Sequence, residues 1–135
     1  MSPQFDAIGI VVSDMAASVA FYRLFGLSFP EGGEAEGHVE AVLPGGARLM
    51  LDTEALVRSF DPTFRPRSEA GRIGLAFLCE DPDEVDLVYD AVLDAGHTGE
   101  RPPWDAFWGQ RYATVLDPDG NSIDLFAPLE DDRDS

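Results

Sequence analysis

The sequence contains the same succession of elements twice, and this repetition constrains the fold more than any other feature. In the first half, the β-branched run 7–12 is followed by Asp14, a suitable N-cap for a helix that ends at Gly26. In the second half, the run 72–79 leads in the same way to Asp81, which precedes an amphipathic helix. Each half is therefore predicted to begin with a strand and a helix.

Each half then ends in strands joined by a tight turn. The predicted hairpins combine 38–44 with 47–52, and 111–117 with 122–128. The segment between the halves is rich in Phe, Pro and Arg, and loops of its length are usually functional or mobile. We expect a single domain over 1–135, with modules at 5–52 and 72–128, a joint at 53–71 and an acidic tail at 129–135.

The charge of the chain narrows the choice of partners. It contains 26 acidic and 9 basic residues, which gives a net charge of −17 at pH 7. Such a surface repels phosphate, so we expect no nucleic-acid partner and no anionic membrane, whereas a cationic small molecule would be attracted. The alternative is a surface that serves solubility alone.

Cysteine content and hydropathy predict a cytoplasmic protein. The one cysteine, Cys79, excludes an internal disulfide. The N-terminus lacks the basic and apolar regions of a secretory signal. No apolar run approaches the roughly 20 residues that span a bilayer.

The doubled βαβββ pattern resembles the vicinal oxygen chelate superfamily, which includes glyoxalase I, extradiol dioxygenases, fosfomycin-modifying enzymes and the bleomycin- and mitomycin-binding resistance proteins. Two stretches carry the resemblance, "IGIVVSDMAASVAFYRLFGL" (8–27) and "GQRYATVLDPDGNSIDLF" (109–126). It implies an α+β fold in which two βαβββ modules form a cup-shaped mixed sheet with helices on its outer face. In the enzymes of this family the cup holds a divalent metal.

The resemblance also implies where the metal ligands would stand. They come from the first and last strands of each module, at positions that correspond here to Ala7, Met50, Gly74 and Asp124. Only Asp124 offers a ligand for a hard cation, and a catalytic metal needs three or four. The histidines, His38 and His97, do not readily replace the missing ligands. We therefore expect no metal and no cofactor.

Strand alternation gives the predicted cup a floor of small residues. If the positions that the resemblance assigns to metal ligands face the cup, so do residues two apart from them, which places Ala7, Gly9, Gly74 and Ala76 toward the cup together with Asp124 and Phe126. The space above them is a ligand cavity or is filled by neighbouring loops. Asp124 is costly to bury unless paired, and its partner is Arg111, the Tyr112 hydroxyl or a ligand.

The aromatic residues before the last hairpin are interpreted as a wall of the same site. Trp104, Phe107 and Trp108 follow two prolines and fit neither helical nor strand periodicity, which predicts a loop. Phe60 and Phe64 would form the opposite wall. The alternative is a dimer interface or a small core cluster. The predicted ligand-binding residues are Trp104, Phe107, Trp108, Arg111, Tyr112, Asp124, Phe126, Met50, His38, Phe60 and Phe64.

These features favour a metal-free binding protein that sequesters a planar or cationic small molecule, similar to the antibiotic-binding resistance proteins of the family. One alternative is an enzyme of the same superfamily, a lyase, isomerase or dioxygenase-like protein, that uses Asp124 as a base or has a non-standard metal site. Another is a protein-interaction module. We also expect a homodimer, because modules of four strands leave sheet edges open.

Overall fold

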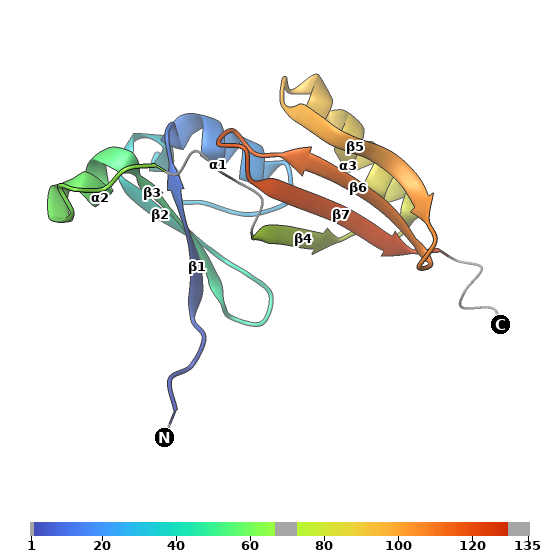
Figure 1. Ribbon diagram of the computed structural model, residues 1–135, viewed down its shortest axis with the longest axis horizontal. Coiled ribbons are helices and arrows are strands. Elements are labelled where there is room, and N and C mark those ends of the chain that lie inside the picture. The colour runs from blue at the N-terminus through green and yellow to red at the C-terminus, as the bar shows by residue number, and fades with distance from the viewer. Residues whose placement is uncertain (1, 67–72, 130–135) are drawn as a thin grey trace. The chain divides into compact units, whose positions relative to one another are not determined.

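The computed structural model describes residues 2–66 and 73–129 (Figure 1). The chain divides into two compact units, with the boundary between Ser68 and Glu69. Unit 1 precedes this boundary and unit 2 follows it, and each is described by itself. The end of the predicted joint (67–71), the first residue of the predicted strand 72–79, and 130–135 of the predicted tail lie outside the described residues.

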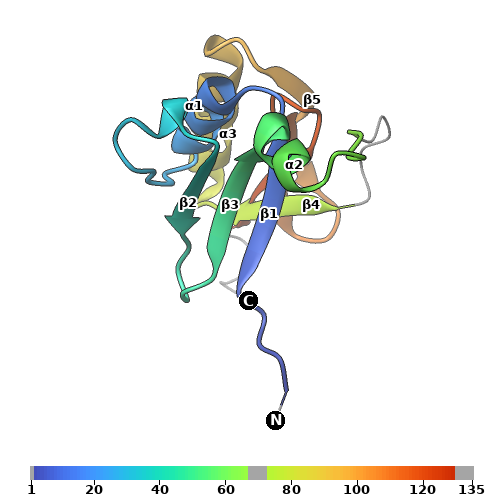
Figure 2. The same ribbon diagram turned by 90° about the vertical axis from the view of Figure 1, so that its left-hand side faces the viewer.

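Unit 1 is a three-stranded mixed sheet with helices. Its elements are β1 (Ala7–Val12), α1 (Met15–Arg23), the 3-10 turn η1 (Gly33–Ala35), β2 (His38–Val42), β3 (Arg48–Thr53) and α2 (Glu54–Phe60). The strand order is β1-β3-β2, with β1 parallel and β2 antiparallel to β3 (Figure 2). A βαβββ module has a fourth strand, but the described chain between α1 and β2 forms turns and η1 instead. Gly32 there has a φ of 80°, outside the strand region.

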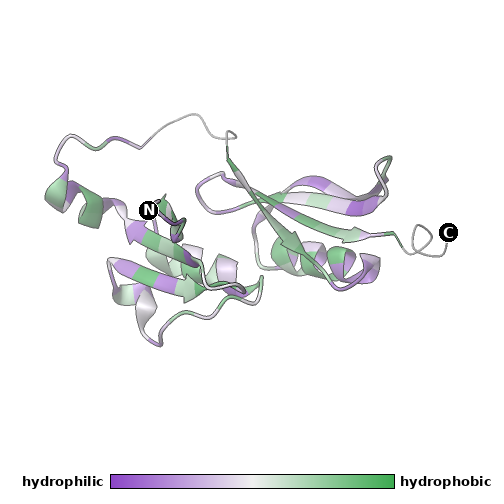
Figure 3. Ribbon diagram, turned by 90° about the horizontal axis from the view of Figure 1, so that it is seen from below, coloured by the Kyte–Doolittle hydropathy of each residue, from purple (hydrophilic) through white to green (hydrophobic). Residues whose placement is uncertain are grey.

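The core of unit 1 lies between α1 and one face of its sheet. The carboxylate of Asp14 accepts a hydrogen bond from the Ala17 amide at 3.1 Å, as predicted for the cap of α1. Hydrophilic and hydrophobic residues alternate along β2, so the strand has one apolar face (Figure 3). The fully buried side chains include Phe21 and Tyr22 of α1 and Leu49 and Leu51 of β3.

Unit 2 is a four-stranded mixed sheet with one helix. Its elements are β4 (Gly74–Leu78), α3 (Pro82–Asp94), β5 (Thr98–Ala106), β6 (Gln110–Leu116) and β7 (Ser122–Pro128). The strand order is β4-β7-β6-β5, in which β4 and β7 are parallel and the other pairs antiparallel. This order of elements is the predicted βαβββ. With two mixed sheets and helices, the α+β fold class is confirmed.

Helix α3 covers one face of the unit 2 sheet. Asp81 caps it, because its carboxylate accepts a hydrogen bond from the Glu84 amide at 2.8 Å. Val85 and Val92 of α3 are fully buried, as is Ile123 of β7. Burial along β7 alternates, so its even-numbered residues from Ser122 to Phe126 lie on the face opposite α3.

Two local predictions are corrected. Trp104 was expected in a loop, but it lies in β5, and only 107–109 form the turn that follows. Pro102 and Pro103 also lie in β5, which is tolerated because β5 is an edge strand with register shifts between Gly99 and Trp104. The joint, for which no helix was predicted, contains α2, capped by the Thr53 hydroxyl. No helix in the described part of the chain is long and apolar enough to cross a membrane.

Candidate functional site

The face of the unit 2 sheet opposite α3, the open face, carries two rows of side chains. Strand register places Leu78, Phe126, Tyr112 and Trp104 side by side across the four strands. The neighbouring row consists of Ala76, Asp124 and Thr114. An apolar and largely aromatic row thus lies beside a polar one.

Asp124 is the acidic centre of the second row. One carboxylate oxygen accepts a hydrogen bond from the Tyr112 hydroxyl at 2.5 Å, and the other accepts one from the Thr114 hydroxyl at 2.9 Å. The carboxylate is only half-buried, so part of it remains accessible. These bonds offset the cost of partly burying a charge and fix its orientation.

Of the predicted partners of Asp124, the structure shows Tyr112 and not Arg111. The Arg111 guanidinium donates to both carboxylate oxygens of Asp86 on α3, at 3.0 and 3.1 Å, and to Asp105 at 3.1 Å. Arg111 therefore lies on the α3 side of the sheet, away from the open face. Its predicted role as a partner of Asp124 was wrong, because neighbouring strand residues point to opposite faces.

Tyr112 acts as a hydrogen-bond donor in this arrangement. Burial, together with the hydrogen bond to the Asp124 carboxylate and its charge, raises the pKa of Tyr112 to about 12. At neutral pH the phenol therefore keeps its proton. Its hydroxyl holds the carboxylate in place and is not poised to become a nucleophile or a base.

Around Tyr112 the aromatic rings form a connected cluster. Trp108 contacts Trp104, Phe107 and Tyr112 edge to face, with ring centroids 5.5, 4.9 and 5.4 Å apart. Tyr112 in turn lies 6.4 Å from the ring of Phe126. The Trp108 indole donates to the Gln110 side chain at 2.8 Å. The rings of the predicted aromatic wall thus contact one another and Tyr112, while their role in lining a ligand site stays a prediction.

The cluster is more exposed than a core would be. Trp108 is 48% exposed and Phe107 90% exposed. Trp104 is less accessible, and the Arg101 guanidinium lies 5.5 Å from its ring centroid. Its indole nitrogen is buried without a hydrogen-bond partner among the described residues. Contiguous exposed aromatic side chains are a feature of ligand-binding sites and of protein interfaces.

Four predicted site residues belong to unit 1. Met50 lies on β3 and pairs with Gly9, and His38 begins β2. Phe60 ends α2 and is 73% exposed, while the Arg58 guanidinium lies 5.8 Å from the Phe64 ring. That these residues share one site with the unit 2 cluster stays a prediction.

The resemblance assigns the metal ligands of the family to four positions, and strand register shows which of these lie opposite which residues. Asp124 pairs with Ala76 and Met50 with Gly9, whereas Ala7 and Gly74 lie two residues earlier on their strands and pair with Arg48 and Ser122. Neither Ala76 nor Gly9 offers a ligand side chain. Among residues 2–66 and 73–129, no group of three or more His, Cys, Asp or Glu side chains is arranged to hold a metal ion. The described residues do not fit the metal centre of the family's enzymes.

Sequence reasoning missed Thr114 and Gln110, which hold Asp124 and Trp108 by hydrogen bonds. Both lie two residues from Tyr112 on β6. The strand alternation that placed Asp124 on this face would have placed them there as well.

Comparison with known proteins identifies the family. The family model described as Glyoxalase/Bleomycin resistance protein/Dioxygenase superfamily matches residues 4–125. The chain belongs to this superfamily. The predicted resemblance to the vicinal oxygen chelate superfamily is thereby confirmed. A search of curated proteins found no significant match.

Several solved structures are similar to this superfamily member. A glyoxalase/bleomycin resistance protein/dioxygenase family enzyme from Burkholderia phytofirmans PsJN has a TM-score of 0.80 at 20% identity, over 94% of this chain and 100% of that one. A glyoxalase/bleomycin resistance protein/dioxygenase from Nocardioides has a TM-score of 0.70 at 26% identity, over 96% and 86%. A glyoxalase-related enzyme from Fulvimarina pelagi has a TM-score of 0.77 at 22% identity, over 92% and 87%. These likenesses support the fold.

Proposed function

We propose that this chain is a metal-free binding protein that sequesters a planar or cationic small molecule on the open face of unit 2. The observation that carries the proposal is the half-exposed aromatic cluster of Trp104, Trp108, Tyr112 and Phe126 beside the Asp124 carboxylate. Apolar walls with a few fixed polar groups are typical of small-molecule sites.

The aromatic cluster supports a planar ligand. The rings contact one another mostly edge to face, and Trp108 remains half-exposed, so its surface is free to contact a further ring. Aromatic contacts contribute about 0.5–1.5 kcal/mol each beyond the area they bury.

Asp124 supports a cationic or hydrogen-bond-donating ligand. Each of its oxygens accepts one hydrogen bond from the protein, and a carboxylate oxygen has a second lone pair. The net charge of −17 also attracts cations over longer distances. The carboxylate next to the rings would then select among the flat molecules that the rings bind.

An enzyme that uses Asp124 as a base is the second candidate. The accessible carboxylate beside an aromatic surface would suit proton transfer from a bound molecule, at the expense of its bonds to Tyr112 or Thr114. The two functions separate when a bound ligand is recovered: a binding protein returns it unchanged, whereas an enzyme returns a product.

The proposal predicts that Asp124→Asn weakens binding of a planar cation more than binding of a neutral molecule of the same shape. A suitable pair is the N-methylacridinium ion and neutral acridine, compared by calorimetry at neutral pH. The substitution removes the charge but keeps the shape, so we expect a loss of about 1 kcal/mol for the cation and little change for acridine.

Asp90→Asn is the matched control, because Asp90 lies exposed on α3 and its replacement changes the net charge equally. If both substitutions weaken binding of the cation to the same extent, the loss comes from long-range attraction and Asp124 does not contact the ligand. The proposed function would be contradicted if the wild type bound neither compound and also bound no member of a broader set of flat cations.

We also propose that the chain forms a homodimer. In unit 2 the strands β4 and β5 are both edges of the sheet, Leu78 at the end of β4 is 67% exposed, and Ile73 just before β4 is 77% exposed. Open edges and exposed apolar side chains of this kind favour association. Light scattering at micromolar concentration should give twice the chain mass of 14.7 kDa, and a mass of one chain would contradict the prediction.

A further inference from the structure

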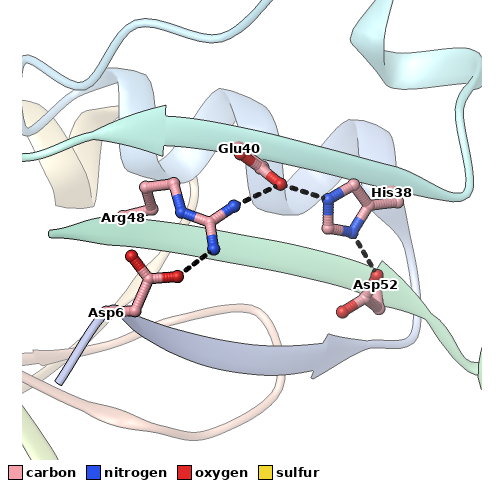
Figure 4. A network of polar contacts seen from close by, with 5 residues as sticks. All are labelled: Asp6, His38, Glu40, Arg48 and Asp52. Carbon is pink, nitrogen blue, oxygen red and sulfur yellow. Dashed lines mark hydrogen bonds and ion pairs between the residues drawn. The ribbon is translucent and has the colours of Figure 1, made fainter. Parts of the chain in front are cut away.

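Unit 1 carries a polar network that the proposed binding site does not use (Figure 4). His38, the first residue of β2, lies opposite Asp52 on β3, and its Nδ1 is 2.5 Å from an Asp52 carboxylate oxygen. Its Nε2 is 2.8 Å from a carboxylate oxygen of Glu40. Arg48 extends the network, since it forms ion pairs with Glu40 at 2.7 Å and with Asp6.

Both ring nitrogens of His38 face a carboxylate, and this geometry defines its protonation state. A neutral imidazole has one N–H donor and one acceptor nitrogen, whereas an ionised carboxylate only accepts. Hydrogen bonds with His38 and then Arg48 lower the pKa of Glu40, which keeps it ionised at neutral pH. The two contacts therefore form together only when the His38 ring carries both protons.

We propose that His38 is a proton-operated switch that holds the carboxylates of Asp52 on β3 and Glu40 on β2 at the same time when it is protonated, and releases one of them when it is not. Glu40 also pairs with Arg48, so it keeps a cationic partner after release. The bond that opens is therefore the one from Nε2 to Glu40, while Nδ1–H continues to donate to Asp52. The open form has an acceptor nitrogen on the sheet face opposite the α1 core, where the His38 side chain is 41% exposed.

The switch stands where three elements meet. Next to Asp52, the Thr53 amide donates to the Gly37 carbonyl at 2.8 Å, and the Thr53 hydroxyl caps α2 by accepting from the Leu56 amide at 3.1 Å. His38 and Asp52 therefore lie at the end of the β2–β3 pair from which α2 begins.

The charges around His38 favour its protonated form. Hydrogen bonds with Glu40 and then Asp52 raise the pKa of His38 above its ordinary value. On α2, which packs on β3, Glu54 and Arg58 pair with each other, and β1 has no charged residue. Glu36, two residues before His38 in the chain, adds another negative charge.

The effect of pH on stability follows from the raised pKa of His38. Because the pKa of His38 is higher in the folded chain, its contribution is fully present below the ordinary histidine pKa. It is lost as the pH rises through the raised value. The unfolding midpoint of the wild type should therefore exceed that of His38→Gln at low pH, with a difference that shrinks as His38 loses its proton.

The direct test is an NMR titration of the full-length protein, with His38→Gln and His97→Gln used to assign the ring signals. We expect His38 to titrate at a higher pH in the folded protein than in the urea-unfolded chain. At low pH both ring nitrogens should give signals of protonated nitrogen, and above the transition Nε2 should give that of an acceptor. Glu40→Gln and Asp52→Asn should each lower the pH at which His38 titrates.

Glu31→Gln is the matched control, because this exposed residue of unit 1 changes the net charge without contacting the network. It should leave the His38 transition almost unchanged. The proposal is overturned if Glu31→Gln lowers the transition as much as Glu40→Gln does, or if His38 titrates as it does in the unfolded chain. It is also overturned if the stability difference from His38→Gln does not vary with pH.

Discussion

Replacement of Gly99 by alanine should lower the free energy of unfolding by about 1–3 kcal/mol, the usual range for an overpacked core. Gly99 lies in β5 against helix α3. A Cβ atom at this position would overlap the Tyr89 hydroxyl, and it would lie 2.8 Å from the Tyr89 ring carbon Cζ and 3.0 Å from Leu93 Cδ1. Tyr89 is only 7% exposed, so its ring has little room to move away.

Two further variants test this explanation by chemical denaturation. Gly74→Ala is the control, since a Cβ there would lie 3.6 Å from its nearest neighbour, an ordinary contact, and stability should change little. Tyr89→Phe removes the overlapping hydroxyl, so adding Gly99→Ala should cost less in that background than in the wild type. Equal costs in both backgrounds would show that the Tyr89 hydroxyl is not what excludes a side chain at Gly99.

Local sequence signals were sufficient for helices α1 and α3 and for the hairpins of both units. Asp14 and Asp81 each accept a hydrogen bond from an amide of the first turn, as their position before an apolar periodic run predicted. The predicted turn at 118–121 is also present. The Asp117 carboxylate stabilises it by accepting hydrogen bonds from the Asp119 and Asn121 amides. Such signals act over a few residues and can be read from the sequence alone.

Elements that depend on distant partners were not predicted. β5 contains two prolines, which argue against a strand unless it lies at an edge, and only the pairing with β6 makes it one. The short helix α2 has no buried residue and no apolar stripe to reveal it. Pairing with β6 decides β5, whereas α2 begins at a local signal, the Thr53 cap, that was not used.

The candidate site shows the same division. Strand alternation placed Asp124 and Phe126 on one face, and it would have excluded Arg111 as a partner had it been applied to β6 as well. The pairing of Met50 with Gly9 rather than Ala7 depends on the register between β1 and β3, and this register cannot be inferred from a local sequence pattern.

Trp108→Ala should weaken binding of a planar ligand by about 1–3 kcal/mol, the scale of burying one large apolar side chain. Trp108 is the centre of the aromatic cluster, because its ring contacts those of Trp104, Phe107 and Tyr112. It is also half-exposed, so its loss removes surface from the site and leaves the buried core of unit 2 unchanged. The thermal unfolding midpoint should therefore stay close to that of the wild type.

Phe107→Ala is the control that separates the effect of Trp108 from the loss of any aromatic side chain in the same turn. Phe107 belongs to the same turn but is 90% exposed, and its ring contacts that of Trp108. Its removal should weaken N-methylacridinium binding, measured by calorimetry, less than Trp108→Ala does. If Trp108→Ala unfolds the protein, Trp108 is a core residue and not a wall of the site. If it leaves both folding and affinity unchanged, the ligand binds elsewhere, because a ring at the centre of the cluster cannot be removed from a stacked ligand without loss of contact area.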